Sequence, residues 1–504
     1  MNGAYLLLLV AVPLAAAATA ALVRAPAVQR GLALAVPAAG TVAGVLLVLH
    51  HRSEPVVAHQ TGGFIPGVAI PFVSDTLSAV LITVTSFTSL VCVAFLAGTG
   101  EDRYRLVPAL VLMLLGGVNG ALLTGDLFNL FVFIEVMLLP SYALIAVTGT
   151  WRRLGIGRYF VVVNLLTSTI LLIGVGLVYA TAETVNLAQL AGRAAEEPMV
   201  GLAVAVVLLA LGIKAGVVPA HGWLPRSYPA TSAGMMALFS ALHTKVALYA
   251  IFRVYAVTYE GEAPWLAVLA VVVGLTVVVG AVSTFAETVV RRALAFQMVT
   301  GVGHILIGLV LFTPLALAAG LFYLVHHIVT MASLVLTAGA IEQTYGSGRF
   351  DRLSGLARRD RWVATVAALG LFSLVGLPPS SGFFAKVGLV QAAAERGGWQ
   401  QWTFVTLIIV AALATLVAMQ RLWAKVFWGP DLDRYRPDSP ETGRAPMTSL
   451  PPEVRVSAVH AAPGAVLLGA ALALFLAAGA VLPVLLRAAG GLLDTVPYIE
   501  AVLP

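Results

Sequence analysis

The sequence has 504 residues, of which 60% are hydrophobic and only 10% are charged, and its formal net charge is +6. This composition is too apolar for one soluble domain of that length, so the expected surroundings are a lipid bilayer. The basic residues are scattered between apolar runs, which argues against a nucleic-acid-binding face. The single cysteine, Cys92, excludes a disulfide framework and a cysteine-based metal site.

Fourteen apolar runs are long enough to cross a bilayer, since a spanning helix needs about 20 predominantly apolar residues. In chain order they cover residues 4–23, 31–49, 74–97, 106–124, 127–148, 158–180, 200–218, 229–257, 265–285, 293–312, 314–340, 362–390, 402–426 and 464–486. The first run is followed by Arg24 and has no positive residue before it, which is the reverse of a signal peptide and predicts a retained helix. The expected fold is an all-α polytopic membrane protein of about 14 transmembrane helices.

The connections that follow odd-numbered helices hold most of the arginines, including the cluster from Arg349 to Arg361. When residues near helix ends are assigned to the nearer connection, the even-numbered connections hold only Arg52, Arg193, Arg253 and Arg396. By the positive-inside rule the odd-numbered connections face the cytoplasm, and both termini lie on the outer side. The longest hydrophilic stretch, from Pro430 to Ala461, carries several prolines and both signs of charge, so it is read as a solvated connector rather than a domain.

Four charged residues remain inside predicted helices: Glu135, Lys214, Lys245 and Lys386. A charge at the bilayer centre costs roughly 2.5–3.5 kcal/mol on insertion scales, and such residues usually face the bundle interior or a hydrated path. The chain has only four lysines, three of which are in this group, whereas no arginine is expected in the middle of a helix. A desolvated lysine can release its proton near neutral pH and an arginine cannot, which favours a proton pathway. The alternative is a set of structural ion pairs that hold helices together.

Two predicted helices, the seventh and the twelfth, contain breaks. The segment 212–219 reads GIKAGVVP and ends at Pro219, and the segment 376–386 reads GLPPSSGFFAK with Pro378 and Pro379 near its start. Irregular backbone at membrane depth is tolerated only where protein or a water-filled cavity surrounds it. The two helices would run in opposite directions, as inverted repeats require. Ordinary proline kinking is the alternative.

The remaining titratable groups at this depth are His243, His304, His326 and His327. Any of them could connect lysines, although an intramembrane histidine can also serve only to hydrogen-bond a neighbouring helix. Asp75 and Asp126 stand at the starts of the third and fifth predicted helices, where a carboxylate is expected to cap the helix.

The segment 124–136 reads TGDLFNLFVFIEV, and here the sequence resembles the antiporter-like subunits shared by respiratory complex I and the multisubunit Mrp-type Na+/H+ antiporters. Further matching segments are IKAGVVPAHGWLP at 213–225, TKVALY at 244–249, FYLVHH at 322–327 and GLPPSSGFFAK at 376–386. The segment at 124–136 is most similar to the D-type subunits of the Mrp antiporters. The resemblance covers nearly all of the predicted helices.

This resemblance implies two inverted five-helix repeats at residues 106–257 and 265–426, with peripheral helices one to three at 1–105. A cytoplasmic connector at 427–463 and a last helix and tail at 464–504 complete a single transmembrane domain, 1–504.

The resemblance also implies a row of proton-carrying groups at mid-membrane. Glu135 and Lys214 form the first ion pair, and Lys245 and His327 connect it to Lys386. The accessory candidates are His243, His304, His326 and Ser333. Many relatives have a lysine four positions after the double histidine, where this chain has Met331, so His327, Ser333 or water would make the connection to Lys386.

The function implied is that of a proton-translocating subunit of a multisubunit cation/H+ antiporter in the bacterial cell membrane. Its expected partners are subunits of the A, B, C, E, F and G types, together with H+, a monovalent cation such as Na+, and membrane lipid. No cofactor, metal or enzymatic activity is expected. Two alternatives stay open: a proton-pumping membrane-arm subunit of a complex I-like or hydrogenase-linked oxidoreductase, and a scaffold subunit that does not transport.

Overall fold

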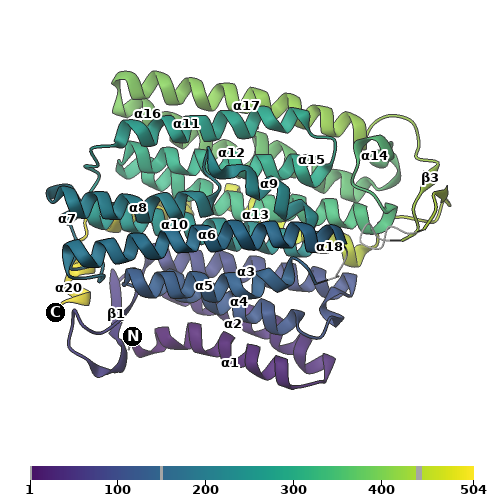
Figure 1. Ribbon diagram of the computed structural model, residues 1–504. Coiled ribbons are helices and arrows are strands. Elements are labelled where there is room, and N and C mark those ends of the chain that lie inside the picture. The colour runs from purple at the N-terminus through teal and green to yellow at the C-terminus, as the bar shows by residue number, and fades with distance from the viewer. Residues whose placement is uncertain (1–2, 148–150, 439–444) are drawn as a thin grey trace.

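A computed structural model describes residues 3–147, 151–438 and 445–504 as long helices packed side by side, with two small hairpins at the ends of the bundle (Figure 1). The α-helices are α1 (Leu8–Leu22), α2 (Pro26–His50), α3 (Thr76–Thr99), α4 (Val107–Leu123), α5 (Leu127–Leu144), α6 (Trp151–Ala182), α7 (Arg193–Glu196), α8 (Pro198–Ala215), α9 (Trp223–Ser227), α10 (Ala233–Tyr259), α11 (Leu266–Ser283), α12 (Val290–Leu311), α13 (Pro314–Tyr345), α14 (Leu356–Arg359), α15 (Arg361–Val375), α16 (Ser381–Arg396), α17 (Gly398–Val426), α18 (Ala458–Leu476), α19 (Ala478–Leu493) and α20 (Val496–Val502). The strands are β1 (Val56–Gln60), β2 (Pro71–Asp75), β3 (Arg434–Tyr435) and β4 (Thr448–Ser449).

Twelve helices within the described ranges are long and apolar enough to cross a membrane, and they match twelve of the fourteen expected spans. The other two expected spans contain shorter apolar helices, α4 with 17 residues and α15 with 15 residues, and α16 continues beyond α15. The predicted all-α polytopic fold is therefore confirmed. One detail differs: the last expected span is two helices, α18 and α19, that meet at Ala477.

Both predicted helix breaks are present, and the helix before each break ends at a glycine in the same backbone conformation. After α8, Gly216 adopts a left-handed conformation (φ 85°) and the Val217 N–H donates to the Gly212 carbonyl at 3.0 Å. After α15, Gly376 does the same (φ 87°), and the Leu377 N–H donates to the Phe372 carbonyl at 2.9 Å. These are Schellman motifs, in which a glycine closes the last turn of a helix. The breaks therefore place two helix C-termini inside the bundle.

The centre of the bundle is formed by α10, α12 and α13, whose apolar stretches are almost entirely covered by other helices. Helices α1 and α2 lie along one edge, and α11 and α17 lie along the opposite edge (Figure 1). Helix α3 differs from the expected peripheral position, because it packs against α10, α13 and α18. The buried charges discussed below therefore lie on or beside the most enclosed helices.

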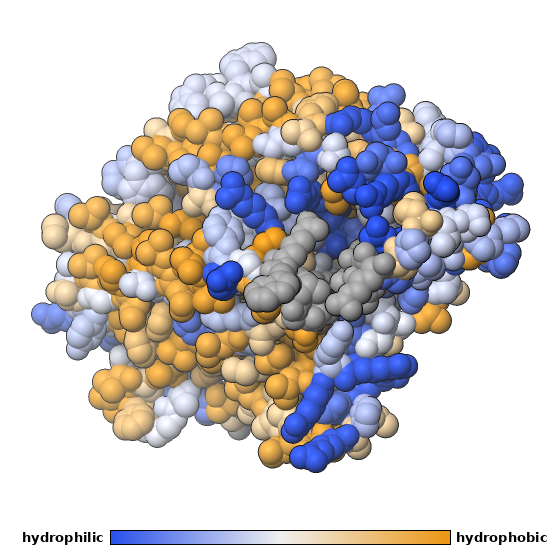
Figure 2. Space-filling model, turned by 45° about the vertical axis from the view of Figure 1, so that its right-hand side comes forward, coloured by the Kyte–Doolittle hydropathy of each residue, from blue (hydrophilic) through white to orange (hydrophobic). Residues whose placement is uncertain are grey.

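The two ends of the bundle differ in character. The C-terminal segment lies beside the β1–β2 hairpin, where the Gln60 amide donates to the Val502 carbonyl at 2.7 Å, and the N-terminus lies at the same end (Figure 1). The opposite end holds α14 and the β3–β4 hairpin, and hydrophilic side chains gather there (Figure 2). The expected connector at 427–463 ends earlier than predicted, because α18 begins at Ala458, and its residues 439–444 lie outside the description.

Candidate functional site

A serine hydroxyl joins Glu135 to Lys214. Glu135 is on α5, Ser168 is on α6 and Lys214 is in the last turn of α8. The Ser168 hydroxyl donates to the Glu135 carboxylate, and the Lys214 ammonium donates to the Ser168 oxygen at 2.9 Å. A hydroxyl that accepts from one charged group and donates to the other is suited to pass a proton between them. Ser168 was not among the residues proposed from the sequence.

Glu135 differs from the expectation in one respect, because its side chain is half-buried rather than enclosed. It shares a face of α5 with Phe128 and Leu139, which are 48% and 55% exposed, at spacings of seven and four residues. Neighbouring helices of this chain leave that face open, whereas Lys214, Lys245 and Lys386 are all buried. The Glu135 carboxylate, at which the row begins, is thus accessible from the side of the molecule.

Lys214 and Lys386 each lie at the C-terminal end of a broken helix. Lys214 occupies the last turn of α8 itself. Lys386 comes from α16 and reaches back to α15, where its ammonium donates to the Val375 carbonyl at 2.6 Å and to the Leu374 carbonyl at 3.4 Å. A helix C-terminus carries unpaired carbonyls and partial negative charge, so it stabilises an ammonium group. The helix C-termini at the breaks thus help to stabilise the lysine charges, because one carboxylate cannot balance three ammonium groups.

His243 lies next to Lys214 across a small cavity. A cavity of about 10 Å³ is lined by both residues together with Asn164. That is close to the space needed for one water molecule, roughly 10–15 Å³. The imidazole is held by the Ser141 hydroxyl at 2.8 Å from Nε2 and stacks on Phe239 at a centroid distance of 4.7 Å. His243 is therefore positioned beside the first pair.

Lys245 is two residues further along α10 and faces the second half of the bundle. Its ammonium donates to the Thr244 hydroxyl at 2.9 Å and to the Ser240 carbonyl at 3.2 Å. It is close enough to His327 to interact with it electrostatically. Neither ring nitrogen of His327 makes a well-formed hydrogen bond among the described residues, although the backbone of Gln297 lies nearby.

Two further histidines, His326 and His304, both interact electrostatically with Lys386. His326 Nδ1 lies 2.9 Å from the Ser381 hydroxyl at the start of α16. His304 donates from Nδ1 to the Thr300 carbonyl at 2.9 Å, and its ring stacks on Tyr323. His304 and His326 therefore interact with Lys386, whereas the adjacent His327 interacts with Lys245.

The remaining candidate, Ser333, does not join this row. Its hydroxyl donates to the Gly464 carbonyl of α18 at 2.7 Å, so it connects two helices. Met331 is fully buried one turn beyond His327, so the position where the resemblance implies a lysine holds an apolar side chain. The groups that lie between Lys245 and Lys386 in this chain are thus histidine rings.

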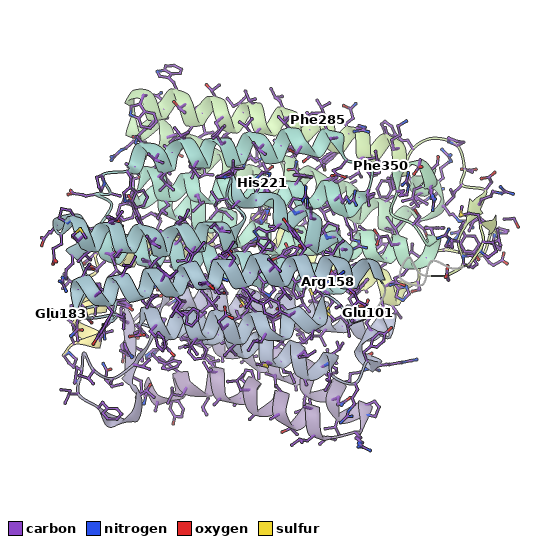
Figure 3. The ribbon with its side chains drawn as sticks, viewed as in Figure 1. Glu101, Arg158, Glu183, His221, Phe285 and Phe350 are labelled. Carbon is purple, nitrogen blue, oxygen red and sulfur yellow. The ribbon has the colours of Figure 1, made fainter. Side chains whose placement is uncertain are left out.

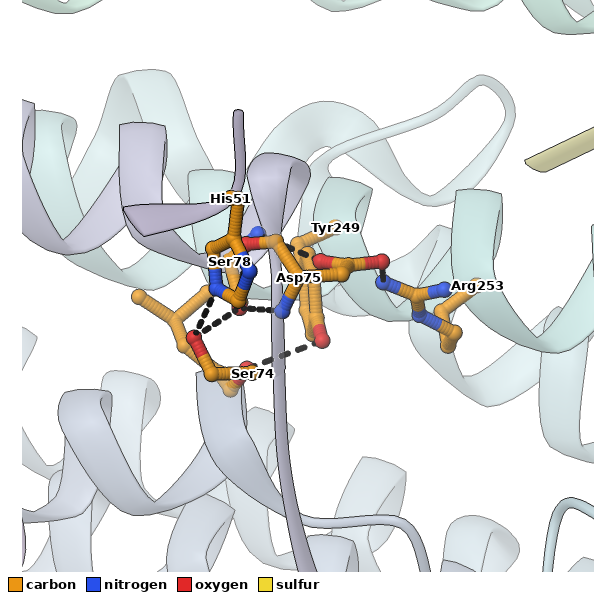
Figure 4. A network of polar contacts seen from close by, with 7 residues as sticks. His51, Ser74, Asp75, Ser78, Tyr249 and Arg253 are labelled. Atoms are coloured by element: carbon orange, nitrogen blue, oxygen red, sulfur yellow. Dashed lines mark hydrogen bonds and ion pairs between the residues drawn. The ribbon is translucent and has the colours of Figure 1, made fainter. Parts of the chain in front are cut away.

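A second buried charge cluster was missed by sequence reasoning (Figure 4). Asp75 caps α3 in a capping box with Ser78, as expected, and it also forms an ion pair with Arg253. Arg253 was assigned to a connection because it is near a predicted helix end, but this was wrong: it is inside α10 and only 3% exposed. The cluster continues to His51, whose Nε2 lies 2.9 Å from the Ser74 hydroxyl. Burial raises the pKa of Asp75, but Arg253 and the Ser78 N–H outweigh burial and hold it below its ordinary value.

We expect Asp75→Asn to destabilise the protein by about 3–5 kcal/mol, because it leaves the buried Arg253 without its carboxylate. The measurement is the temperature at which the purified complex loses its size-exclusion peak. Asp126→Asn is the matched control, since Asp126 caps α5 by accepting from the Asn129 N–H at 2.7 Å and asparagine caps as well as aspartate. Adding Arg253→Gln to Asp75→Asn should recover much of the loss. Equal melting of the Asp75 and Asp126 variants would contradict the structural role of the pair.

The chain is similar to known membrane subunits over most of its length. The profile of the NADH:quinone oxidoreductase/Mrp antiporter transmembrane family matches residues 124–413. The D-type subunit of the Na+/H+ antiporter of Alkalihalophilus pseudofirmus is 31% identical over 474 residues, covering 92% of each chain. The corresponding Bacillus subtilis protein is 31% identical over 481 residues, covering 94% of each.

Solved structures give the same picture. A chain of the Mrp complex from Dietzia sp. DQ12-45-1b is 42% identical and superposes with a TM-score of 0.93, covering 99% of both chains. A chain of an archaeal membrane-bound sulfane sulfur reductase has a TM-score of 0.85 at 23% identity and covers 99% of this chain and 100% of its own length, which shows a shared fold.

Proposed function

The chain belongs to the NADH:quinone oxidoreductase/Mrp antiporter family of transmembrane subunits, and we propose that it is the D-type subunit of a multisubunit Na+/H+ antiporter and carries protons. The observation that carries this proposal is the hydrogen-bonded group Glu135–Ser168–Lys214 at the break of α8. The lysine and histidine row that extends from it towards the break of α15 supports the same function. The chain is thus a transporter subunit of a bacterial membrane complex.

The proposed proton transfer begins at Glu135. When this carboxylate takes up a proton, the Lys214 ammonium loses its counter-charge in a buried position, which favours release of the lysine proton. His243 lies across the one-water cavity and is placed to receive it. The half-buried position of Glu135 means that the first proton can arrive from a neighbouring subunit of the A, B, C, E, F or G type rather than from within this chain.

The second half of the row carries the proton onward. Neither ring nitrogen of His327 is held in a well-formed hydrogen bond in the described structure, so this residue can accept from Lys245 on one nitrogen and release from the other. His326 and His304 then lead to Lys386, at the break of α15. Water that enters at this break would complete the path to one side of the membrane, because irregular backbone at this depth borders protein or water-filled cavities.

For the orientation, we propose that the hydrophilic end of the bundle faces the cytoplasm and that both termini lie outside. The arginine cluster from Arg349 to Arg361 supports this by the positive-inside rule. The position of the C-terminal segment beside β1, at the other end, is consistent with it.

A redox-linked function is the competing candidate, because the fold is shared with a subunit of the sulfane sulfur reductase. In such a complex this chain would move protons in the same way, and other subunits would hold the redox centres. Iron–sulfur or flavin absorbance in the natively purified complex would favour that candidate over the antiporter.

The proposal is tested in everted membrane vesicles from a bacterial host deficient in Na+/H+ antiport. With all subunits expressed, we expect added Na+ to dissipate a preformed pH gradient, and we expect no dissipation when only this chain is omitted. Li+ and K+ additions define the cation specificity, and native gels report whether the other subunits still assemble. Unchanged Na+/H+ exchange without this chain would overturn the proposal.

A further inference from the structure

A cationic cavity lies at the hydrophilic end of the bundle, away from the proton row. Its volume is about 310 Å³, and its lining residues are Thr288, Arg349, Phe350, Asp351, Arg421 and Lys425. Phe350 and Phe285, which border this region, both lie towards that end, beside the outer helices (Figure 3). The cavity therefore lies where membrane-spanning helices end.

Two of the three cations in this cavity have no carboxylate partner among the described residues. Arg349 is paired with Asp351 through two hydrogen bonds of 2.9 Å. Arg421 instead donates to the Phe285 carbonyl and lies over the Phe350 ring, with its guanidinium carbon 5.9 Å from the ring centroid. Lys425 follows Arg421 by four residues on α17, so the two side chains share one helix face. The cavity thus holds two adjacent positive charges, one of which, the Arg421 guanidinium, is fixed in place by these contacts.

An apolar wall leads from the membrane interior to this cavity. Helices α11 and α17 pack together at the edge of the bundle (Figure 1). In the half of each helix nearest the cavity, exposed aliphatic residues recur at helical spacing: Leu275, Val278 and Val282 on α11, and Val410, Leu413 and Val417 on α17. The exposed Trp399 and Trp402 lie at the other end of α17. The α17 stripe continues directly into Arg421. A stripe of this kind matches hydrocarbon chains, whereas a specific protein interface is typically richer in aromatic residues.

We propose that this site binds an anionic phospholipid, with the phosphate between Arg421 and Lys425 and the acyl chains along α11 and α17. Basic pockets between helices at a membrane surface recognise acidic headgroups, and both charge and hydrocarbon are matched here. Neither residue belongs to the proton row, so this site is additional to the proposed function.

The test uses the intact complex in detergent and a fluorescent phosphatidylglycerol. We expect the double variant Arg421→Gln/Lys425→Gln to bind this lipid roughly 25-fold more weakly, since each basic residue near an anionic lipid contributes about a fivefold factor. Binding of fluorescent phosphatidylcholine should not change. Arg358→Gln/Arg361→Gln removes the same charge from the same end and should leave phosphatidylglycerol binding within about twofold of the unaltered complex.

Three outcomes would overturn the proposal. The first is equal phosphatidylglycerol affinity in the double variant and its control. The second is displacement of the lipid by millimolar inorganic phosphate, which would identify a free-anion site. The third is loss of another subunit from the double variant with lipid binding retained, which would assign the surface to a protein contact. Arg421→Lys/Lys425→Arg keeps both charges and should retain binding, which separates the site from a folding defect.

Discussion

Glu135→Gln is expected to reduce Na+/H+ exchange to the level of vesicles that lack the complex. Glutamine has nearly the same shape and can still accept a hydrogen bond from the Ser168 hydroxyl, but it can neither take up a proton nor carry a negative charge. Lys214 is then buried without a counter-charge at all times, which favours its neutral form whether or not a proton has arrived. Both the entry of the proton and the control over Lys214 are lost. Exchange is measured as Na+-dependent dissipation of a pH gradient in everted vesicles.

Glu183→Gln is the matched control, because Glu183 is an exposed glutamate directly after α6, at the end of the bundle (Figure 3). It should leave exchange unchanged. Glu135→Asp keeps the charge but shortens the side chain, so we expect partial activity. Full exchange in the Glu135→Gln complex would refute the assignment. Normal assembly with lost exchange would reject a purely structural role, whereas parallel loss of assembly and exchange would support the scaffold alternative.

The charged members of the site could be predicted from the sequence because their cost is visible there. Lys214, Lys245 and Lys386 lie within strongly apolar segments, so they stand out in a hydropathy profile. Ser168 could not be found in this way, because a serine inside an apolar helix costs little and usually bonds to its own backbone. Its position between Glu135 and Lys214 depends on how α5, α6 and α8 pack. Such bridging hydroxyls are set by tertiary structure.

Arg253 was missed for a related reason. It is six residues from the end of α10, close enough to be read as part of a loop, and its partner Asp75 is 178 positions earlier in the chain. A hydropathy profile has no means to pair them. The half-buried position of Glu135 is also invisible in the sequence, since most residues of α5 are apolar enough to face either lipid or protein. Long-range contacts decided both cases.

The fold itself followed from hydropathy except at the ends of helices. The β1–β2 hairpin was not expected, because each strand has only five residues and the connection between them is rich in glycine. The junction at Ala477 has no glycine or proline directly beside it that would mark a break. The two breaks that were predicted both have such residues. Helix breaks could therefore be predicted from the sequence where a glycine or proline marked them.

The two breaks use their lysines in different ways. Lys214 belongs to the helix that ends, whereas Lys386 belongs to the helix that follows and reaches back to the carbonyls of Leu374 and Val375. In the first case a carboxylate shares the ammonium through Ser168. In the second case no carboxylate is paired with the lysine among the described residues, and its ammonium donates to neutral carbonyls. Lys386 is therefore held at its break without a carboxylate, and substitution of Lys386 tests proton release at that break.

Lys386→Ala and Lys386→Arg are both expected to reduce exchange to background, for different reasons. Alanine removes the proton carrier and leaves the α15 carbonyls without their donor. Arginine restores a positive donor at this helix end, but its guanidinium stays protonated and cannot pass a proton on. The arginine variant should therefore assemble and melt like the unaltered complex while exchange is lost. Both are measured in the same vesicles, with native gels for assembly.

Arg396→Ala, on the exposed end of α16, is the control for substitution of a basic residue in the same helix, and it should leave exchange intact. The comparison of the two Lys386 variants separates charge from proton transfer. If Lys386→Arg retains exchange, a fixed positive charge at the break of α15 is sufficient and the proton row ends before Lys386. If only Lys386→Ala loses activity together with assembly, the lysine acts as a helix cap. Loss of exchange in the well-assembled arginine variant is the result that identifies Lys386 as a carrier.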